Sequence, residues 1–357
     1  MTISVAMATY NGDRFIREQL ESLAAQTRLP DELVVSDDGS TDRTLGIVEE
    51  FAHTAPFPVR VYRNVRKLGY GDNFLKAAEL CSSDWIAFCD QDDVWLPQKL
   101  ATVERYLTWP GRDVLLVAHS ATVADENLIP TVARQPDIRR LRVCGASDLP
   151  AGWYVAGLAL TFRADLVRAL SPWNRGPDGG IPSMPLAHDV WICRLARILG
   201  DVVLLPDSLC LYRRHESTTT VAFRGDTRRR GKLPMIQRAI ATALASGTEE
   251  YTNYSVAFDH QAKAFGRLGR EQDRGVWRER LLGAELQYAE FSAWMATRAR
   301  LYSSPSLGGR FGCLRYLARN GNYLRFMRLR ALVKDSFVAI LGGRRLSGRK
   351  LHGSERC

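Results

Sequence analysis

Three carboxylates stand close together in the segment FCDQDDVWLP, which runs from Phe88 to Pro97. Asp90, Asp92 and Asp93 follow a short apolar run, and like charges at this spacing repel one another unless a cation shares the site. Hard cations such as Mg²⁺ and Mn²⁺ prefer oxygen ligands, and Mg²⁺ commonly combines one or two carboxylates with water and phosphate oxygens. The spacing therefore predicts a divalent metal held by Asp90 and Asp92 together with a diphosphate. The alternative is an acidic turn that caps a helix starting near Pro97.

Alternating β-rich and helical segments must position these acids. Residues 3–119 alternate short apolar runs with amphipathic helical patterns, which is typical of a mostly parallel sheet covered by helices. Ligands bind such sheets beyond the carboxyl ends of the strands. Three polar segments follow expected strands, namely TYN (Thr9, Tyr10 and Asn11), DDGSTD (beginning with Asp37 and Asp38) and DQDD. We expect them at one edge of the sheet, where an acid of DDGSTD can accept hydrogen bonds from a nucleobase or a ribose.

A second group of segments follows residue 119. The sequence predicts a glycine-interrupted strand that runs into a helix over 149–170, and a Gly/Pro loop over 172–185. AHDVWICRLARILG is typical of a helix, DVVLLPD of a strand, and SLCLYRRH of a further strand that ends in cations. Cations at a strand end suit charge-assisted hydrogen bonds to phosphate, although a solvated basic strand end is the alternative.

Charge is distributed unevenly along the 357 residues. The segment from Gly225 to Cys357 has 25 Lys and Arg against 11 Asp and Glu, whereas residues 1–224 have 24 against 28. The first residues, MTISVAMATYN, lack a basic leader, and no window is apolar enough to cross a membrane. Seven scattered cysteines without a CxxC pair indicate reduced thiols. We therefore expect a cytoplasmic protein whose basicity lies in its C-terminal third.

Four segments taken together resemble a known enzyme family. VAMATYNGDRFIREQLESLAAQT, DELVVSDDGSTDRT, NVRKLGYGDNFLKAAE and WIAFCDQDDVWLPQKL are similar to family 2 glycosyltransferases with the GT-A fold, and most of all to the bacterial rhamnosyltransferase-like subgroup. The similarity runs in order from about Ile3 to His215. It implies an α/β, Rossmann-like, mostly parallel sheet flanked by helices, a nucleotide-diphosphate-sugar donor carried on dTDP or UDP, and a divalent metal. It also implies transfer with inversion to a hydroxyl of a glycan or a lipid-linked acceptor.

The resemblance assigns roles to individual residues. Asp92 is the expected metal ligand, Asp90 lies near the ribose and the metal, and Asp93 supports the site or contacts the sugar. The implied general base is Asp189 in LAHDVW, which inversion requires on the face opposite the leaving group. The remaining nucleotide-sugar contacts are Thr9, Tyr10, Asn11, Asp37, Asp38, Gly69, Asn73, Arg214 and His215. The expected acceptor contacts are Trp153, Tyr154, Gly157, His188 and Trp191, for which core packing is an equal alternative. The chain departs from the subgroup after His215, where ESTTT replaces the usual Asn and Gly.

The predicted organisation has three parts. Residues 1–224 form the catalytic domain, with a nucleotide-sugar-binding half (1–119) and an acceptor-binding half (120–224). Residues 225–342 form a basic helical region, and residues 343–357 a disordered tail. The helical region mixes cations such as Arg315, Arg319 and Lys334 with apolar residues such as Leu317 and Ile340. It suits an anionic membrane surface, or it caps the catalytic domain or another subunit.

The sequence thus predicts a metal-dependent inverting glycosyltransferase of bacterial cell-surface polysaccharide synthesis, with rhamnose the favoured sugar. A sugar-nucleotidyltransferase is less well supported, because TYNGD stands where a phosphate-binding loop rich in Gly, Arg and Lys would follow the first strand. A non-catalytic nucleotide-sugar-binding protein is the other alternative. No nucleic-acid-binding module accompanies the basic segment, so we expect no nucleic acid partner.

Overall fold

The structure is a computed structural model of the chain, and it describes residues 1–216, 247–319, 323 and 329–341. The chain divides into two compact units. Unit 1 comprises Met1–Arg175, Leu186–Thr219 and Leu268–Leu281, and unit 2 comprises Gly176–Pro185, Thr220–Arg267 and Leu282–Cys357. Each unit is described by itself below.

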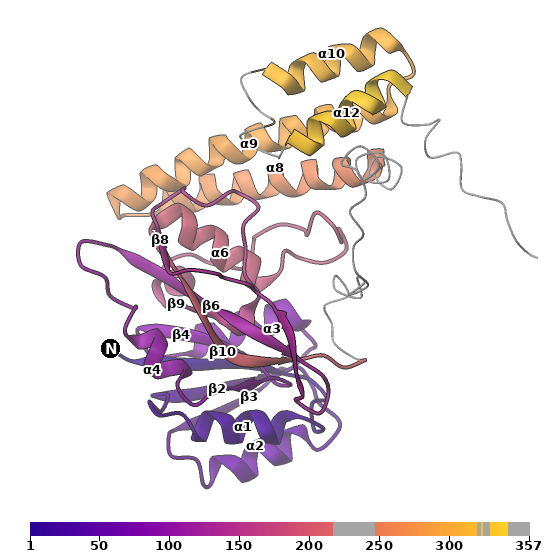
Figure 1. Cartoon of the computed structure of the whole chain (residues 1–357). Helices are drawn as coiled ribbons and strands as arrows, with labels where there is room; N and C mark the ends of the chain where they lie inside the picture. The colour runs from indigo at the N-terminus through magenta and orange to yellow at the C-terminus, as the bar shows by residue number, and fades with distance from the viewer. Residues whose placement is uncertain (217–246, 320–322, 324–328, 342–357) are drawn as a thin grey trace, which may run out of the picture. The chain divides into compact units, whose positions relative to one another are not determined.

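Unit 1 is built on one mixed sheet with the strand order β3-β2-β1-β4-β9-β6-β10-β5 (Figure 1). The first half is parallel and consists of β1 (Ile3–Thr9), β2 (Glu32–Asp37), β3 (Val59–Arg63) and β4 (Trp85–Asp90). Most side chains of β1, β2 and β4 are buried, as expected for a sheet covered on both faces. This confirms the predicted α/β architecture.

The second half of the sheet combines parallel and antiparallel pairs. Its strands are β5 (Val94–Trp95), β6 (Val114–Ala124), β7 (Pro130–Arg134), β8 (Arg142–Cys144), β9 (Leu160–Arg163) and β10 (Asp201–Arg213). β10 runs parallel to β6, whereas β9 is antiparallel to both β4 and β6. The two strands predicted over residues 201–213 are one strand here, because register shifts on either side of Ser208 let β10 continue past Pro206.

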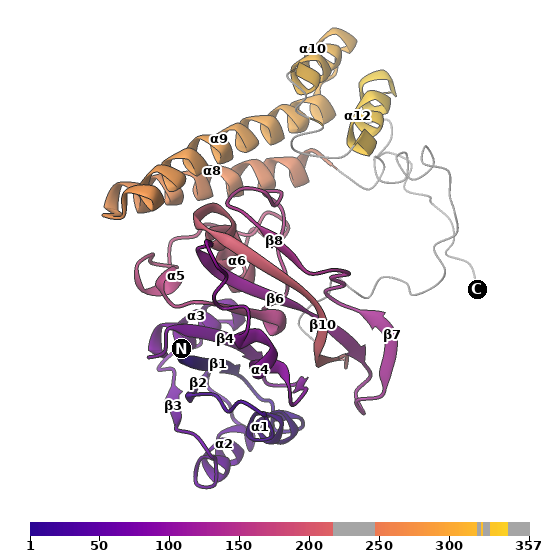
Figure 2. The same ribbon diagram turned by 60° about the vertical axis from the view of Figure 1, so that its left-hand side comes forward.

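Helices cover both faces of the sheet. α1 (Ile16–Ala24) and α2 (Thr44–Ala52) lie on one side, and α3 (Tyr70–Leu80) and α6 (His188–Leu199) on the other, as Figures 1 and 2 both show. α1 buries Ile16, Leu20 and Leu23 on the face that packs against the sheet, as its helical spacing of apolar residues requires. Short helical segments complete the unit: α4 (Lys99–Glu104), η1 (Gly157–Ala159) and α5 (Asp165–Arg168).

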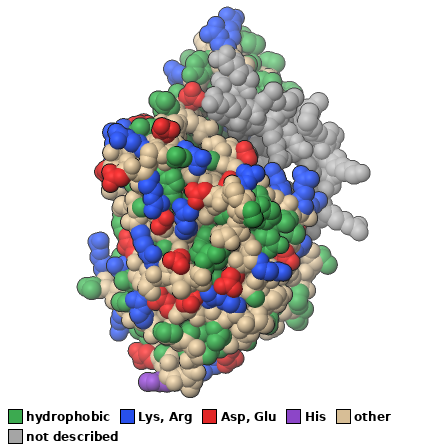
Figure 3. Space-filling model, turned by 90° about the vertical axis from the view of Figure 1, so that its left-hand side faces the viewer, with side chains coloured by type: hydrophobic (Ala, Val, Ile, Leu, Met, Phe, Trp, Pro, Cys, Tyr) green, Lys and Arg blue, Asp and Glu red, His purple; other side chains and the backbone are tan. Residues whose placement is uncertain are grey.

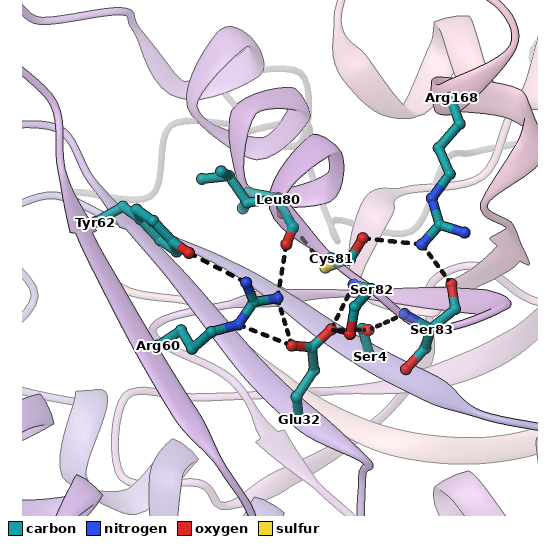
Figure 4. A network of polar contacts seen from close by, with 10 residues as sticks. Ser4, Glu32, Arg60, Tyr62, Leu80, Cys81, Ser82, Ser83 and Arg168 are labelled. Carbon is teal, nitrogen blue, oxygen red and sulfur yellow. Dashed lines mark hydrogen bonds and ion pairs between the residues drawn. The ribbon is translucent and has the colours of Figure 1, made fainter.

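A polar network closes the amino edge of the parallel strands (Figure 4). Glu32, at the start of β2, accepts hydrogen bonds from the hydroxyl of Ser4 (2.5 Å) and from the backbone N–H of Ser82 (2.6 Å), and it pairs with the guanidinium of Arg60. Burial raises the pKa of Glu32, but these hydrogen bonds outweigh it, so the pKa is lowered overall. The amino edge is therefore satisfied internally, which leaves the carboxyl edge for ligands.

Unit 2 is mostly helical in its described part and also includes the loop Gly176–Pro185. Its helical residues come from α8 (Thr248–Glu271), α9 (Gly275–Ser303), α10 (Leu307–Ala318) and α12 (Leu329–Leu341); α8 and α9 also contribute to unit 1. Parts of the predicted helical region over 225–342, and the whole predicted tail over 343–357, lie outside the described residues. Among the helices of the described ranges, none is long and apolar enough to cross a membrane.

A buried ion pair joins the helices of unit 2. The guanidinium of Arg298 donates to both carboxylate oxygens of Asp335 at 2.9 and 2.8 Å, and both side chains are buried. Tyr323 also donates to Asp335 (2.8 Å), and Lys334 donates to the hydroxyl of Tyr251 (2.6 Å). These polar contacts lie beside an apolar core that includes Trp294, Leu301, Leu317 and Val338.

Candidate active site

Four strands end at one edge of the sheet in unit 1. Parallel pairing sets Thr9 opposite Asp37 and Ala8 opposite Asp90, so the ends of β1, β2 and β4 lie side by side. The end of β10 joins them, because the backbone N–H of Arg213 donates to Asp93 (2.9 Å). The structure therefore brings together the TYN, DDGSTD, DQDD and YRRH segments that the sequence placed at strand ends.

Four carboxylates interact at this edge. Burial, followed by the nearby charges of Asp92 and Asp189, raises the pKa of Asp90 to about 8, so Asp189 lies within electrostatic range of the DQDD segment. Burial, followed by the charges of Asp92 and Asp90, raises the pKa of Asp93 well above its usual value. The Oδ2 atom of Asp93 is buried and has no hydrogen-bond partner in the described part of the chain. Such an excess of negative charge favours binding of a cation.

The donor atoms fit a hard divalent cation only in part. Asp90 and Asp92 offer carboxylate oxygens, which Mg²⁺ and Mn²⁺ prefer. Within residues 1–216, 247–319, 323 and 329–341, no three His, Cys, Asp or Glu side chains are grouped so that they could hold a metal by themselves. A metal at this edge would therefore take the rest of its ligands from a diphosphate and water, as Mg²⁺ commonly does.

Asp92 and His215 are in direct contact. The Nε2 atom of His215 lies 2.8 Å from Oδ2 of Asp92, and its ring packs on Phe15 at 4.7 Å between centroids. Arg214, by contrast, directs its guanidinium to the hydroxyl of Tyr212 (2.7 Å). His215 therefore lies against the acidic segment.

The first two loops are held by their own hydrogen bonds. Asp37 is completely buried and accepts from the hydroxyl of Thr9 (2.9 Å) and from the backbone N–H groups of Gly39 (3.1 Å) and Ser40 (2.8 Å). Asn11 has a left-handed backbone conformation (φ 46°), and its side chain accepts from the N–H of Thr41 (2.9 Å). Asp37 and Asn11 thus hold the backbone of the first two loops in place, and the same hydrogen bonds fix the orientation of their side chains.

Asp38 binds the loop that leads into α3. Its carboxylate accepts from the backbone N–H groups of Leu68 (2.6 Å) and Gly69 (2.8 Å) and from the side chain of Asn64 (3.3 Å). Gly69 has a φ of 87°, which side chains disfavour, and directly precedes α3. Asn73 is buried in α3 and donates to the carbonyl oxygen of Thr9 (3.2 Å). These residues connect the loop over 64–69 to the ends of β1 and β2.

Tyr10 is the exposed aromatic residue of the first loop, with 42% of its surface accessible. The ammonium of Lys67 lies 3.6 Å from the centre of its ring, which is a cation–π contact. The side-chain amide of Gln91 bonds to both the N–H (3.0 Å) and the carbonyl oxygen (3.1 Å) of Tyr10. Gln91, the uncharged residue of DQDD, therefore ties the acidic segment to the first loop.

The residues predicted on the acceptor side have different environments. Asp189 lies in the first turn of α6, where its Oδ1 accepts from the backbone N–H of Val190 (2.7 Å). Tyr154 is exposed and Trp153 half-buried in the loop before η1. Trp191 is completely buried in the core of unit 1. Its predicted contact with the acceptor is therefore wrong, because a side chain without accessible surface offers no face to a ligand.

His188 is a buried, neutral side chain beside Asp189. Burial, followed by the charge of Arg175, lowers the pKa of His188 to about 3. Its ring stacks on Phe74 at 4.2 Å, and within the described residues neither of its ring nitrogens has a hydrogen-bond partner. A Cβ atom at Gly157 would lie 2.8 Å from Nε2 of His188, so Gly157 gives the imidazole its space. In this structure both residues support the start of α6.

Sequence reasoning missed three residues that shape the edge: Gln91, Lys99 and Arg213. Lys99 is completely buried, its ammonium donating to the carbonyl oxygen of Leu158 (2.8 Å) and lying 3.5 Å from the ring centre of Trp95. Its charge lowers the pKa of Asp90 and of Asp93, which makes it a buried counter-charge for them. No pattern in the sequence separates Lys99 from an ordinary surface lysine of a helix.

Comparison with known proteins agrees with the fold. Residues 4–153 match the family model "Glycosyl transferase family 2". The crystal structure of Staphylococcus aureus TarS, residues 1–349, in complex with UDP has a TM-score of 0.51 and 16% identity, and the match covers 100% of this chain and 94% of that chain. The fold is therefore the predicted GT-A fold with a helical C-terminal region, and residues 4–153 are similar to glycosyl transferase family 2.

Relatives among characterised and uncharacterised proteins agree with this family. An uncharacterized protein of Mycobacterium tuberculosis is 28% identical over 221 residues, which are 60% of this chain and 59% of that protein. An uncharacterized glycosyltransferase of Nostoc is 34% identical over 223 residues, 60% of this chain and 65% of that protein. The dTDP-rhamnosyl transferase RfbG of Shigella flexneri is 43% identical over 98 residues, 26% of this chain and 34% of that protein. The chain thus spans less than two thirds of each of these relatives.

Proposed function

We propose that this protein is an inverting glycosyltransferase that moves a sugar from a nucleoside-diphosphate donor to a hydroxyl group of a glycan or a lipid-linked acceptor. The observation that carries the proposal is the placement of Asp90 and Asp92, at the end of β4 and in the segment after it, at the carboxyl edge of the sheet, within electrostatic range of Asp189 at the start of α6. The family match supports the reaction class. The partial similarity to a dTDP-rhamnosyl transferase supports dTDP-rhamnose as the favoured donor, and a bacterial cell-surface polysaccharide as the product.

In this proposal the chain's own residues divide the work between two sides of the sugar. Asp189 accepts the proton of the attacking hydroxyl, as a general base must do when the anomeric carbon is inverted. Asp90 and Asp92 would hold a divalent metal on the diphosphate side, and the metal would supply positive charge to offset the charge that develops on the leaving group. His215 keeps the carboxylate of Asp92 oriented, and Asp38 with the TYN loop receives the nucleoside.

The test is calorimetric titration of the purified protein with dTDP, UDP, GDP and CDP, each with and without Mn²⁺. We expect one nucleotide to bind in a Mn²⁺-dependent manner, and Asp92→Asn to abolish that dependence. Asp207→Asn is the matched control, because Asp207 is an exposed acid on β10. Absence of nucleotide binding by the wild-type chain, or equal binding by Asp92→Asn, contradicts the proposed site.

We further propose that α10 brings the enzyme to an anionic membrane surface, where lipid-linked acceptors reside. Residues 291–334 contain nine Lys and Arg and no Asp or Glu. In α10, Leu307, Phe311 and Tyr316 are exposed beside Arg315, a combination that suits the boundary between headgroups and acyl chains. Figure 3 shows basic and hydrophobic side chains side by side on the face that it draws.

Burial limits which C-terminal residues can contact a membrane surface. Leu317 and Lys334 are buried in the helical core of unit 2, so neither of them faces a membrane. Arg325 and Arg328 lie outside the described residues. A truncation within α10 would remove core residues, so point substitutions are the better test.

Flotation with liposomes tests the membrane proposal. The double variant Phe311→Ser/Tyr316→Ser should lose binding to phosphatidylglycerol vesicles, and the wild type should not bind phosphatidylcholine vesicles. Leu286→Ser is the control, since Leu286 is an exposed apolar residue of α9. Equal flotation of the double variant and the control would contradict the proposal, and a concentration-dependent dimer lost in the double variant would instead assign this face to a second copy of the chain.

A further inference from the structure

Arg213, the last residue of β10, is buried at the carboxyl edge with 2% of its surface accessible. Its Nε donates to the backbone carbonyl oxygen of Asp92 (2.7 Å), and its Nη1 donates to that of Glu126 (2.6 Å). Its Nη2 pairs with the carboxylate of Glu18 in α1. The guanidinium also lies over the ring of Phe15, 4.5 Å from its centre. One side chain thus connects α1, the DQDD segment, the turn after β6 and the end of β10.

The acidic segment is attached to residue 213 twice. Besides the bond from the guanidinium to the carbonyl group of Asp92, the backbone N–H of Arg213 donates to Oδ1 of Asp93 (2.9 Å). Two residues further on, His215 contacts the carboxylate of Asp92. The end of β10 therefore fixes both the backbone and the side chain of the residue expected to bind the metal.

These contacts distinguish Arg213 from a phosphate ligand. Each of its three guanidinium nitrogens already donates to an acceptor within the protein, and the side chain is buried. Its charge is offset by Glu18, so it is a paired charge that does not depend on a substrate anion. The role of Arg213 is therefore to hold the neighbouring residues in position.

The position of Asp92 needs such support because the segment is rich in like charge. Asp90, Asp92 and Asp93 lie within four positions of the sequence. Without a fixed backbone, repulsion would move the carboxylates apart and toward solvent. A planar guanidinium presents its five N–H donors in a rigid, spread-out set that reaches acceptors on several sides, whereas a lysine ammonium presents its three donors from one nitrogen atom.

We propose that Arg213 is a positioning residue that holds the DQDD segment in the geometry required for metal-dependent binding of the donor diphosphate. The expected effect on nucleotide binding rests on the proposed function. The expected effect on the order of the DQDD segment does not, because it depends only on contacts within the chain. The two parts can therefore be tested separately.

The test compares Arg213→Lys with Arg197→Lys. Arg197 is an equally buried arginine of the same unit that donates to the carbonyl oxygen of Leu149 (3.0 Å), remote in sequence from the acidic segment. We expect Arg213→Lys to weaken Mn²⁺-dependent nucleotide binding by about tenfold or more, as misplacement of a binding group commonly does. Binding without Mn²⁺ should be unchanged, and Arg197→Lys should leave both affinities unchanged even if it lowers the melting temperature.

Hydrogen exchange of the backbone amides of residues 90–94 provides a second readout that needs no ligand. Arg213→Lys should speed exchange in this segment, and Arg197→Lys should not. If Arg213→Lys leaves the exchange unchanged, the inference is overturned, whether or not the wild type binds a nucleotide. If the wild type binds no nucleotide, the proposed function fails as well. If the exchange is faster but Mn²⁺-dependent nucleotide binding is unchanged, the proposed link between the order of this segment and donor binding is overturned.

A milder variant covers the case in which Arg213→Lys does not fold. Glu18 is half-exposed, so Glu18→Gln should be tolerated while it removes the anionic partner of Arg213. We expect it to weaken Mn²⁺-dependent binding in the same direction by a smaller factor, roughly threefold, because one charged hydrogen bond becomes a neutral one. No change in either binding or exchange would overturn the inference.

Discussion

Asp189→Asn is the substitution that separates catalysis from binding most clearly. Asp189 lies in the first turn of α6, and its Oδ1 accepts from the backbone N–H of Val190. Asparagine has the same shape and retains an oxygen for this hydrogen bond. The substitution therefore removes a negative charge and a proton acceptor with little effect on the start of the helix.

Two consequences of opposite sign follow. Loss of a general base costs typically 10² to 10⁴ in rate, or about 2.7 to 5.4 kcal/mol of barrier. Donor binding should not weaken, because the charge of Asp189 is one of the causes that raise the pKa of Asp90. With that charge removed, Asp90 is more readily ionised, so the affinity for a nucleotide with Mn²⁺ should stay equal or increase.

The assay is single-turnover release of the nucleoside diphosphate from its sugar donor, with binding measured by calorimetry on the same preparations. Water can replace the natural acceptor in this assay, since its attack requires the same base. Asp207→Asn serves again as the exposed control. A rate within about threefold of the wild type would refute the assignment, and Asp189 would then be a helix N-terminal residue worth about 0.3 to 1 kcal/mol to stability.

Two further predictions concern stability, both measured by urea unfolding. Glu32→Gln should destabilise unit 1 by about 2 to 3 kcal/mol at pH 7, because an amide group cannot accept all the hydrogen bonds that the carboxylate accepts. Since folding lowers the pKa of Glu32 from 4.5, its stabilisation is present above about pH 4.5 and lost as the pH falls, so the difference between variant and wild type should shrink in acid. Arg17 lowers the pKa of Glu50 as well, but their ion pair is exposed to solvent, so Glu50→Gln should change stability much less than Glu32→Gln. Asp335→Asn should cost about 3 to 5 kcal/mol, because it leaves Arg298 buried without its counter-charge; a loss below 1 kcal/mol would contradict this account.

Much of the site was predictable because it depends on where strands end. The apolar run before Asp90 and the position of Asp37 after β2 sufficed to place both at one edge, since parallel strands end together. Burial was harder to predict. In YRRH the two arginines are chemically identical, and the contacts with α1 and the DQDD segment decide that Arg213 is buried and that Arg214 contacts Tyr212.

The same limit applies to Trp191 and Lys99. An aromatic residue near Asp189 suits a sugar platform as well as a core position, and the packing of α6 decides for the core. A lysine in a short helix is ordinarily exposed, whereas Lys99 is covered by Trp95 and Leu158 from other segments. Long-range packing of this kind leaves no periodic signal in the sequence.

The hydrogen bonds of Asp38 limit how a ligand can be received at the second loop. A carboxylate has about four acceptor positions, and the groups that donate to Asp38 from Asn64, Leu68 and Gly69 use three of them. A ligand with a single N–H group can take the open position and leave the loop in place. A ligand that presents two adjacent donors must displace part of the loop. Under the proposed function, the number of free acceptor positions on Asp38 therefore decides which nucleosides the second loop can bind, and the backbone N–H groups of the chain compete with the ligand for them.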